Sequence, residues 1–144
     1  MALYIPKRIL FVDDQPGGVY PVMIESLKND AVFTVVISGQ LALAALLKGD
    51  IQFDCLRTDF RMPRMNGIQF LTTLREKYQE ILRKLEWVIF KSSDTTPEMA
   101  VELGLVRQMR PDKQTRLMEA SDECALWLKL LRRKEDPQEF CVDY

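Results

Sequence analysis

Histidine is absent from this chain of 144 residues. Its absence excludes Ser-His-Asp and Cys-His catalysis, and it excludes zinc sites that need an imidazole ligand. It also means that the chain holds no histidine that could act as a phosphodonor. A phosphoryl group on any acidic side chain here would have to come from another molecule.

Cysteine is scarce, and long apolar runs are missing. The three cysteines, Cys55, Cys124 and Cys141, are odd in number and widely spaced, so they form neither a disulfide framework nor a zinc site. No apolar run approaches the roughly 20 residues of a membrane span, and the N-terminus lacks a signal-peptide pattern. We therefore expect a cytoplasmic protein. The net charge of -1 gives no argument for nucleic acid or a membrane surface as a partner.

The composition is that of an ordinary globular domain. Hydrophobic residues make up 47% of the chain and charged residues 28%, and 144 residues suffice for one domain with a sizeable core. Short apolar runs alternate with helix-like segments, and we find no internal repeat. This alternation is typical of an α/β fold with a parallel sheet.

The sequence predicts five strands separated by helices. The expected strands are residues 8–12, 33–37, 55–58, 87–90 and 106–109, and helices begin near residues 17, 38, 66, 95 and 112. Thr95 and Glu98 form a capping box around Pro97, which predicts a short helix that ends at Gly104. Residues 79–86 either extend the preceding helix or form a separate packed turn.

Acidic residues follow two of the expected strands. Asp13 and Asp14 come directly after the first strand, and Asp59 follows the third. Ligands of an open parallel sheet bind outside the carboxyl ends of its strands, where three carboxylates would then converge. A hard divalent cation such as magnesium would relieve their repulsion. One carboxylate could act as a nucleophile towards a phosphoryl group.

These motifs resemble the receiver domain of two-component response regulators, of the single-domain chemotaxis type. The resemblance rests on Asp13-Asp14, on Asp59 with Met62-Pro63 and Gly67, and on Ser92-Ser93 after an apolar strand. It spans about residues 6–132. It implies a flavodoxin-like five-stranded parallel sheet with helices on both faces. Residues 1–132 would form the domain, and residues 133–144 would be the end of the last helix and a tail.

The resemblance also implies roles for particular residues. Asp59 would be the phosphoacceptor. Asp13, Asp14, Asp59 and the backbone carbonyl of Arg61 would bind magnesium. Ser92 would be the hydroxyl switch that hydrogen-bonds the phosphoryl group.

Further roles follow at the rim of the site. Ser93 would be the small residue that leaves room for the phosphoryl group, and Asp94 would face Arg61 across the entrance. The family lysine after the last strand is missing, and Arg110-Pro111 stands in its expected place. No aromatic residue occupies 105–109, where a switch aromatic is expected.

Arg57 and Lys91 are unusual because they fall inside strands that should be buried on both faces. If Asp59 lies opposite Ser92, alternation puts the two cations on opposite faces of the sheet. Lys91 could partly replace the missing lysine, or it could block metal binding by neutralising the acidic cluster. The sequence leaves both readings open.

The leading hypothesis is a magnesium-dependent phosphoacceptor switch without enzymatic activity of its own. A histidine kinase or phosphotransfer protein would be the phosphodonor, and a downstream protein would bind the face of the last two helices and last strand. No direct nucleic-acid or membrane binding is expected, and a homodimer is left open. The alternative is a degenerate receiver that acts as a phosphorylation-independent interaction module. An aspartyl-phosphate hydrolase is weaker, because no cap domain is present.

Overall fold

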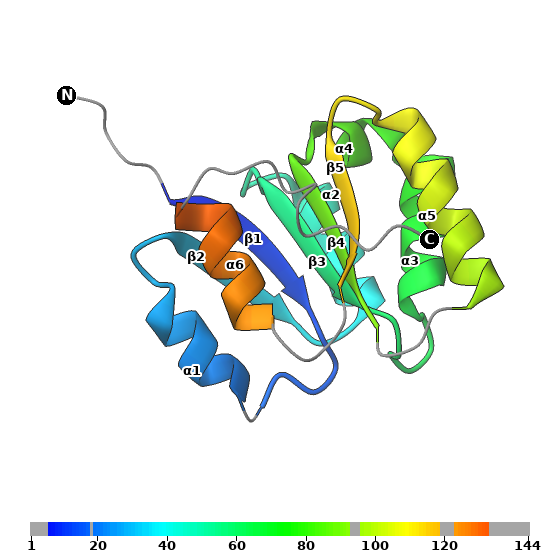
Figure 1. The fold of residues 1–144 in the computed structure, drawn as a ribbon. Helices are drawn as coiled ribbons and strands as arrows, with labels where there is room; N and C mark the ends of the chain where they lie inside the picture. Colours follow the sequence, from blue (N-terminus) through cyan, green and yellow to red (C-terminus); the bar gives the residue numbers. More distant parts are fainter. Residues whose placement is uncertain (1–5, 18, 93–95, 119–122, 133–144) are drawn as a thin grey trace.

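The computed structural model describes residues 6–17, 19–92, 96–118 and 123–132. Within them, five strands form one parallel sheet of order β2-β1-β3-β4-β5 (Figure 1). The strands are β1 (Lys7–Val12), β2 (Ala31–Val36), β3 (Cys55–Asp59), β4 (Trp87–Lys91) and β5 (Gln114–Met118). The predicted flavodoxin-like α/β fold is confirmed.

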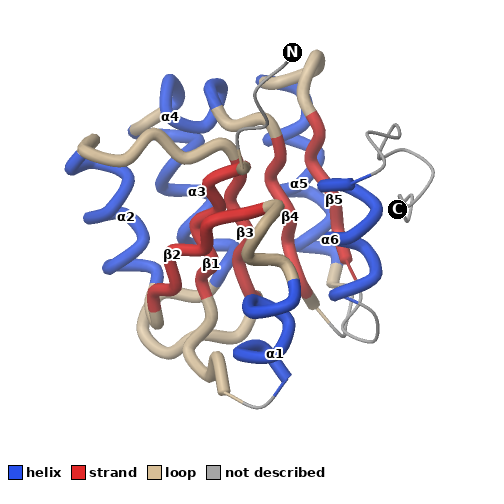
Figure 2. The backbone as a smooth tube through the Cα atoms, turned by 90° about the vertical axis from the view of Figure 1, so that its left-hand side faces the viewer, coloured by secondary structure: helices blue, strands red, loops and turns tan. Residues whose placement is uncertain are grey.

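Helices cover both faces of the sheet (Figures 1 and 2). On one face lie α1 (Val19–Ser26) and α6 (Glu123–Arg132). On the other face lie α2 (Gly39–Lys48), α3 (Gly67–Lys77), α4 (Gln79–Lys84) and α5 (Pro97–Met109). None of the helices in the described ranges combines the length and the apolar character that crossing a membrane requires.

Alternation along the strands builds two hydrophobic cores, one on each face. Leu10 and Leu56 point towards α2–α5, whereas Ile9 and Phe11 point towards α1 and α6. All four side chains are fully buried, as expected for inner strands of a parallel sheet. Trp127 of α6 is fully buried in the second core.

The predicted starts of two helices are confirmed in detail. The side chain of Ser38 accepts a hydrogen bond from the Leu41 amide (3.1 Å), and α2 ends at Gly49 in the left-handed conformation. Asn66 and Gln69 form a complete capping box at the start of α3. This cap fixes where the chain leaves the loop that follows Asp59.

The segment after α3 is a separate short helix and not an extension of α3. The helix is interrupted at Tyr78, which is both the C-cap of α3 and the N-cap of α4. Leu82 and Leu85 are buried against the sheet. Of the two possibilities for residues 79–86, the structure therefore selects the packed turn.

The prediction for the last third of the chain was wrong. Helix α5 does not end at Gly104 but continues to Met109, so residues 106–109 are helical and β5 lies later, at Gln114–Met118. Met99, Leu103 and Val106 form one buried stripe on this helix, which explains why it continues. The N-cap of α5 is Thr96, whose side chain accepts from the Met99 amide, and not Thr95.

The final helix also begins later than predicted. Asp112 lies in the turn before β5, and α6 starts at Glu123. Leu117 therefore belongs to β5 and not to the final helix. Residues 133–144 lie outside the described ranges, and the domain boundary at residue 132 stays a prediction.

Candidate functional site

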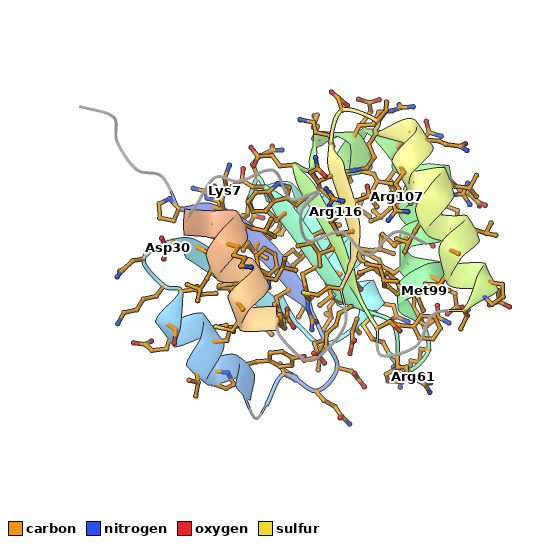
Figure 3. The ribbon with its side chains drawn as sticks, in the orientation of Figure 1. Lys7, Asp30, Arg61, Met99, Arg107 and Arg116 are labelled. Carbon is orange, nitrogen blue, oxygen red and sulfur yellow. The ribbon has the colours of Figure 1, made fainter. Side chains whose placement is uncertain are left out.

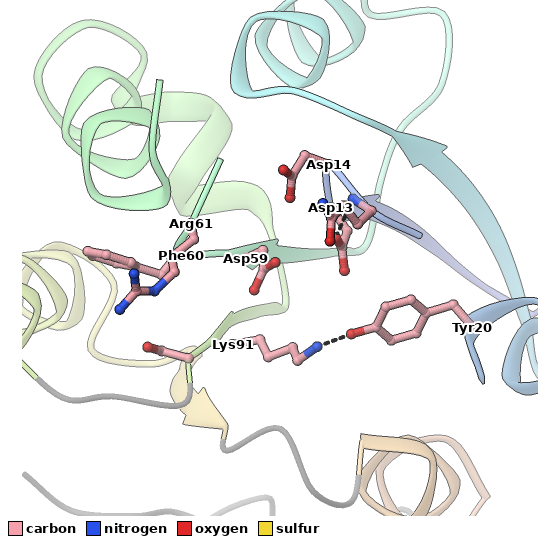
Figure 4. Close-up of a pocket in the computed structure, with 9 residues that line it drawn as sticks. Asp13, Asp14, Tyr20, Asp59, Phe60, Arg61 and Lys91 are labelled. Atoms are coloured by element: carbon pink, nitrogen blue, oxygen red, sulfur yellow. Dashed lines mark hydrogen bonds between the residues drawn. The ribbon is translucent and has the colours of Figure 1, made fainter. Parts of the chain in front are cut away.

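Three carboxylates meet at the carboxyl edge of the sheet, as the sequence predicted. Asp13 and Asp14 follow β1, and Asp59 ends the adjacent strand β3, whose Thr58 pairs with Val12. One oxygen atom from each carboxylate lies within 4.8 Å of the others. They line an open cavity of about 410 Å³, which Figure 4 shows in close-up.

Asp13 is buried and held from several directions. Its backbone amide donates to the Val36 carbonyl (3.0 Å), which ties the end of β1 to β2. Its Oδ1 accepts from the Gln15 amide (2.8 Å), and its Oδ2 accepts from Nη1 of Arg57 (3.3 Å). Asp13 is therefore already oriented, and its charge is partly balanced by a guanidinium group.

Asp59 is half-buried between its acidic neighbours. Burial raises its pKa from 3.8 to about 6, Arg57 opposes this rise, and Asp13 and Asp14 add to it. A carboxyl group with a pKa near 6 is mostly ionised at neutral pH, and a fall of about one pH unit is enough to protonate half of it. A cation placed among these oxygens would oppose the shift, because its positive charge stabilises the ionised carboxylate.

The donor set fits magnesium. Magnesium prefers oxygen ligands, and one or two carboxylates together with phosphate and water oxygens are typical of its protein sites. The acidic cluster offers carboxylate oxygens only, close together and open to solvent on one side. Arg61 lines the same cavity, and the role of its backbone carbonyl as a further ligand stays a prediction.

The loop from Asp59 to Gly67 is folded tightly back on itself. The amide of Phe60 donates to the Lys91 carbonyl (3.1 Å), and the amide of Gly67 donates to the Phe60 carbonyl (2.8 Å). A Cβ atom at Gly67 would lie 2.3 Å from the Asp59 carbonyl oxygen and 2.8 Å from the Phe90 ring. The backbone of Gly67 therefore lies close to the backbone of Asp59, and only a residue without a side chain fits there.

Ser92 lies on the cavity wall with Asp59, directly after β4. Its amide donates to the Met118 carbonyl (3.1 Å), so it is anchored to the end of β5. The structure therefore brings Asp13, Asp14, Asp59, Arg61 and Ser92 together. Ser93 and Asp94, predicted beside the phosphoryl group and at the entrance, lie outside the described residues.

Arg110 does not belong to this site. It precedes β5 and therefore lies at the amino-terminal end of that strand, whereas the acidic cluster lies at the carboxyl ends of β1 and β3. Its assignment to the place of the family lysine was therefore wrong. Its buried guanidinium donates to the carbonyls of Leu82, Glu86 and Gln114 and joins α4 to the starts of β4 and β5. Burial lowers its pKa to about 10, which leaves it charged at neutral pH.

The misplacement of Arg110 followed from the misplaced last strand. The residues that follow β5 are Glu119, Ala120, Ser121 and Asp122, which include no lysine or arginine. Strand β5 itself reads Gln-Thr-Arg-Leu-Met and has no aromatic residue. A switch aromatic is absent from residues 105–109, where the sequence placed it, and the strand that the structure shows also lacks one.

Arg57 and Lys91 lie on the same face of the sheet, which corrects the prediction of opposite faces. Asp59 pairs with Lys91 and not with Ser92, and Arg57 pairs with Ile89. In a parallel sheet, paired residues point the same way, so both cations face α1 and α6. Both donate a hydrogen bond to the hydroxyl oxygen of Tyr20 in α1.

The fully buried Arg57 is matched by a carboxylate that sequence reasoning missed. Its Nε and Nη2 donate to the two oxygens of Glu123 in α6, each at 2.9 Å. Its guanidinium also lies 4.0 Å from the centre of the Phe11 ring. Glu123 had no visible partner in the sequence, because a separation of 66 positions gives no periodic signal.

Comparison with known proteins supports the class that this sheet and site suggest. No protein-family model matches the chain. The chemotaxis protein CheY4 of Vibrio cholerae matches with a TM-score of 0.66 and 23% identity over 90% of this chain and 98% of its own. The beryllofluoride-activated receiver domain of DrrB from Thermotoga maritima matches with a TM-score of 0.62 and 15% identity, over 90% of this chain and 97% of its own.

A curated relative shares more of the sequence. A protein-glutamate methylesterase/protein-glutamine glutaminase of Xanthomonas oryzae pv. oryzae is 34% identical over 107 residues, which is 74% of this chain and 29% of the relative. The chain thus spans less than a third of that relative's length. The chain has the fold of the CheY-like receiver domain of response regulators, and the resemblance seen in its sequence is confirmed.

Proposed function

We propose that this chain is a magnesium-dependent phosphoacceptor switch that is phosphorylated on Asp59. The convergence of Asp13, Asp14 and Asp59 within 4.8 Å at the open edge of the sheet carries this proposal. A structural role for three such carboxylates is hard to argue, because their mutual repulsion destabilises the metal-free fold. A site that binds a cation and receives a phosphoryl group would explain why three carboxylates lie together.

The chemistry needs little from the protein beyond position and charge. A carboxylate oxygen of Asp59 forms a bond to phosphorus, and the bond between phosphorus and the donor's histidine nitrogen breaks, with its electron pair returning to the imidazole. Asp13, Asp14, Asp59 and the Arg61 carbonyl would hold magnesium, which neutralises charge on the phosphoryl oxygens. The Ser92 hydroxyl would donate a hydrogen bond to one of those oxygens.

The partners follow from the same chemistry. Because the chain has no histidine, the phosphodonor histidine lies outside these 144 residues, on a histidine kinase or phosphotransfer protein. The cysteine pattern favours the reducing cytoplasm, where such a donor would meet it. Phosphorylation would bias the surface formed by α5, β5 and α6 towards a downstream protein partner. Ser92 is bonded to the end of β5, which gives the site a direct link to that surface.

The experiment that tests this function compares the wild type with Asp59→Asn. With magnesium and acetyl phosphate, the wild type should gain the mass of one phosphoryl group, and Asp59→Asn should gain none. Asp50→Asn, which changes an exposed aspartate after α2, is the matched control and should be phosphorylated normally. Intact-mass spectrometry at neutral pH is the measurement.

Asp59→Asn should be folded, so a negative result is informative. The pKa of Asp59 is higher in the folded chain than in the unfolded chain, so ionisation between about pH 4 and pH 6 destabilises the fold. Removing that charge should stabilise the metal-free protein at pH 7.5 by about 1–2 kcal/mol, after discounting for partial exposure. An unmodified wild type would refute the phosphoacceptor function.

A second function is favoured by one contact. The Arg57 guanidinium lies 3.3 Å from Asp13 and already balances part of the acidic cluster. A receiver in which this cation replaces magnesium would act as an interaction module that does not depend on phosphorylation. Absence of magnesium binding at millimolar concentrations would favour this alternative.

Magnesium binding should depend on pH in a defined window. Protons compete with the cation for Asp59, whose pKa is about 6, so affinity should be level above about pH 7 and fall roughly tenfold for each unit below pH 6. Isothermal titration calorimetry from pH 5 to pH 8 is the measurement. Asp59→Asn should bind magnesium more weakly and lack this dependence. A wild-type affinity that is equal at pH 5 and pH 7.5 would contradict the prediction.

A further inference from the structure

We propose that Lys91 is the cationic side chain that binds the phosphoryl group on Asp59, and that Tyr20 positions it. This inference rests on the proposed function and adds a residue to it. Lys91 ends β4 and is the register partner of Asp59 at the end of β3. Both side chains therefore point to the same face and line the same cavity.

The charges in the cavity call for such a residue. A phosphoryl group carries roughly 1.5 to 2 negative charges at neutral pH, and Asp13 and Asp14 add two more. One divalent cation and the Arg57 guanidinium, which pairs with Asp13, still leave about one negative charge unbalanced. The four residues after β5, Glu119 to Asp122, contribute no cationic side chain. The remaining positive charge must come from elsewhere around the cavity.

Three cationic side chains are near enough to be considered. Arg57 is fully buried, and its nitrogens donate to Glu123, Asp13, Tyr20 and the Val12 carbonyl. These bonds hold its guanidinium beside Asp13, so it is not available to a phosphoryl group in the cavity. The guanidinium of Arg61 lies on the side of Asp59 away from Asp13 (Figure 4). Lys91 is half-buried and runs alongside Asp59 towards Tyr20 (Figure 4).

Tyr20 gives Lys91 a fixed position without using up its charge. The Lys91 ammonium donates to the Tyr20 hydroxyl oxygen and lies 4.7 Å from the centre of its ring. Within the described part of the chain, it forms no ion pair with Asp13, Asp14 or Asp59. An ammonium has three donors, so two remain for phosphoryl oxygens while one stays on Tyr20. Lys91 therefore leaves the carboxylates to the metal instead of neutralising them by direct contact.

The test separates binding of the metal from binding of the phosphoryl group. Beryllofluoride, a mimic of the phosphoryl group, is titrated into wild type and Lys91→Met at saturating magnesium, and magnesium alone is titrated into both. Lys91→Met should bind beryllofluoride about 10- to 100-fold more weakly, because a hydrogen bond to a charged group is lost. Its affinity for magnesium alone should be unchanged or a few-fold tighter, because a positive charge beside the carboxylates is gone.

Two controls define the cause. Lys91→Arg keeps the charge and should retain most of the beryllofluoride affinity. Lys77→Met removes the same charge from the exposed C-terminal end of α3 and should bind like the wild type. Thermal melts confirm that each variant is folded.

Each result has one meaning. Beryllofluoride affinity that is unchanged in Lys91→Met would overturn the role of Lys91 and leave the phosphoacceptor function standing. So would a parallel loss of magnesium and beryllofluoride binding, which would indicate a structural role, or a Lys91→Arg variant as weak as Lys91→Met. A wild type that binds neither ligand would overturn the proposed function and this inference with it.

Discussion

Replacing Arg57 with methionine should lower the free energy of unfolding by about 3–5 kcal/mol, the usual loss when one partner of a buried ion pair is removed. The Arg57 side chain is fully buried, and both oxygens of Glu123 accept from it at 2.9 Å. Its removal leaves the carboxylate of Glu123, which is 5% exposed, with a hydrogen bond from the Trp127 indole (3.0 Å) but without its cationic partner. Asp13 loses its guanidinium partner at the same time.

The size of this loss should depend on the Glu123 carboxylate that is left without a cationic partner, and not on lost packing. A double variant, Arg57→Met with Glu123→Leu, should therefore recover much of the stability, because apolar residues of similar volume often replace a buried ion pair without loss. Arg83→Met is the matched surface control. It breaks an exposed pair with Glu80 at 3.0 Å and should cost less than about 1 kcal/mol.

Urea unfolding followed by circular dichroism, in buffer with a metal chelator, measures these differences. The chelator matters because a cation bound to the folded protein would add its own stabilisation. A loss of unfolding free energy below about 1 kcal/mol for Arg57→Met would show that the buried ion pair of Arg57 with Glu123 does not contribute to stability as argued. A double variant that is less stable than the single variant would show that packing dominates.

Gly67→Ala should destabilise the protein by up to about 3 kcal/mol and weaken magnesium binding. The added Cβ atom would lie 2.3 Å from the Asp59 carbonyl oxygen and 2.8 Å from the Phe90 ring, so backbone must move to admit it. The backbone that moves belongs to Asp59 itself. The substitution therefore displaces the proposed phosphoacceptor as well as straining the fold.

Gly104→Ala is the matched control for this prediction. Gly104 lies inside α5, and a Cβ atom there would meet nothing within 4 Å. The substitution should be neutral or stabilise by up to about 1 kcal/mol, because alanine favours a helix interior more than glycine does. Equal stabilities of the two variants in urea unfolding, or an unchanged magnesium affinity in Gly67→Ala, would contradict the close-approach argument.

The first two thirds of the fold could be predicted because their signals are local. Apolar runs marked β1, β3 and β4, and side-chain caps at Ser38 and Asn66 marked the starts of α2 and α3. Asp13, Asp14 and Asp59 follow strands directly, so their convergence depends on topology alone and not on long-range detail. The same holds for Ser92 after β4.

The last third failed because its local signals conflict with its packing. Gly104 reads as a helix end, yet the buried stripe of Met99, Leu103 and Val106 continues the helix past it. Strand β5 contains Gln114, Thr115 and Arg116 and lacks the apolar run of a buried strand. Its Thr115 carbonyl accepts from Arg107 of α5, a contact that no sequence period reveals.

The sequence by itself therefore determined strands β1, β3 and β4, the acidic residues that follow two of them and the absence of histidine from this chain, because apolar runs and side-chain types are local features. Only the tertiary structure decided which groups the strand cations Arg57 and Lys91 contact. One residue of register puts Arg57 and Lys91 on the same face, where they share the Tyr20 hydroxyl, and it brings Glu123 from α6 to Arg57. Arg110 was assigned to the site from its place in the sequence, but it lies at the amino-terminal ends of the strands, where it donates to the carbonyls of Glu86 and Gln114. Charge partners across the fold depend on register and helix position, and neither leaves a local mark in the chain.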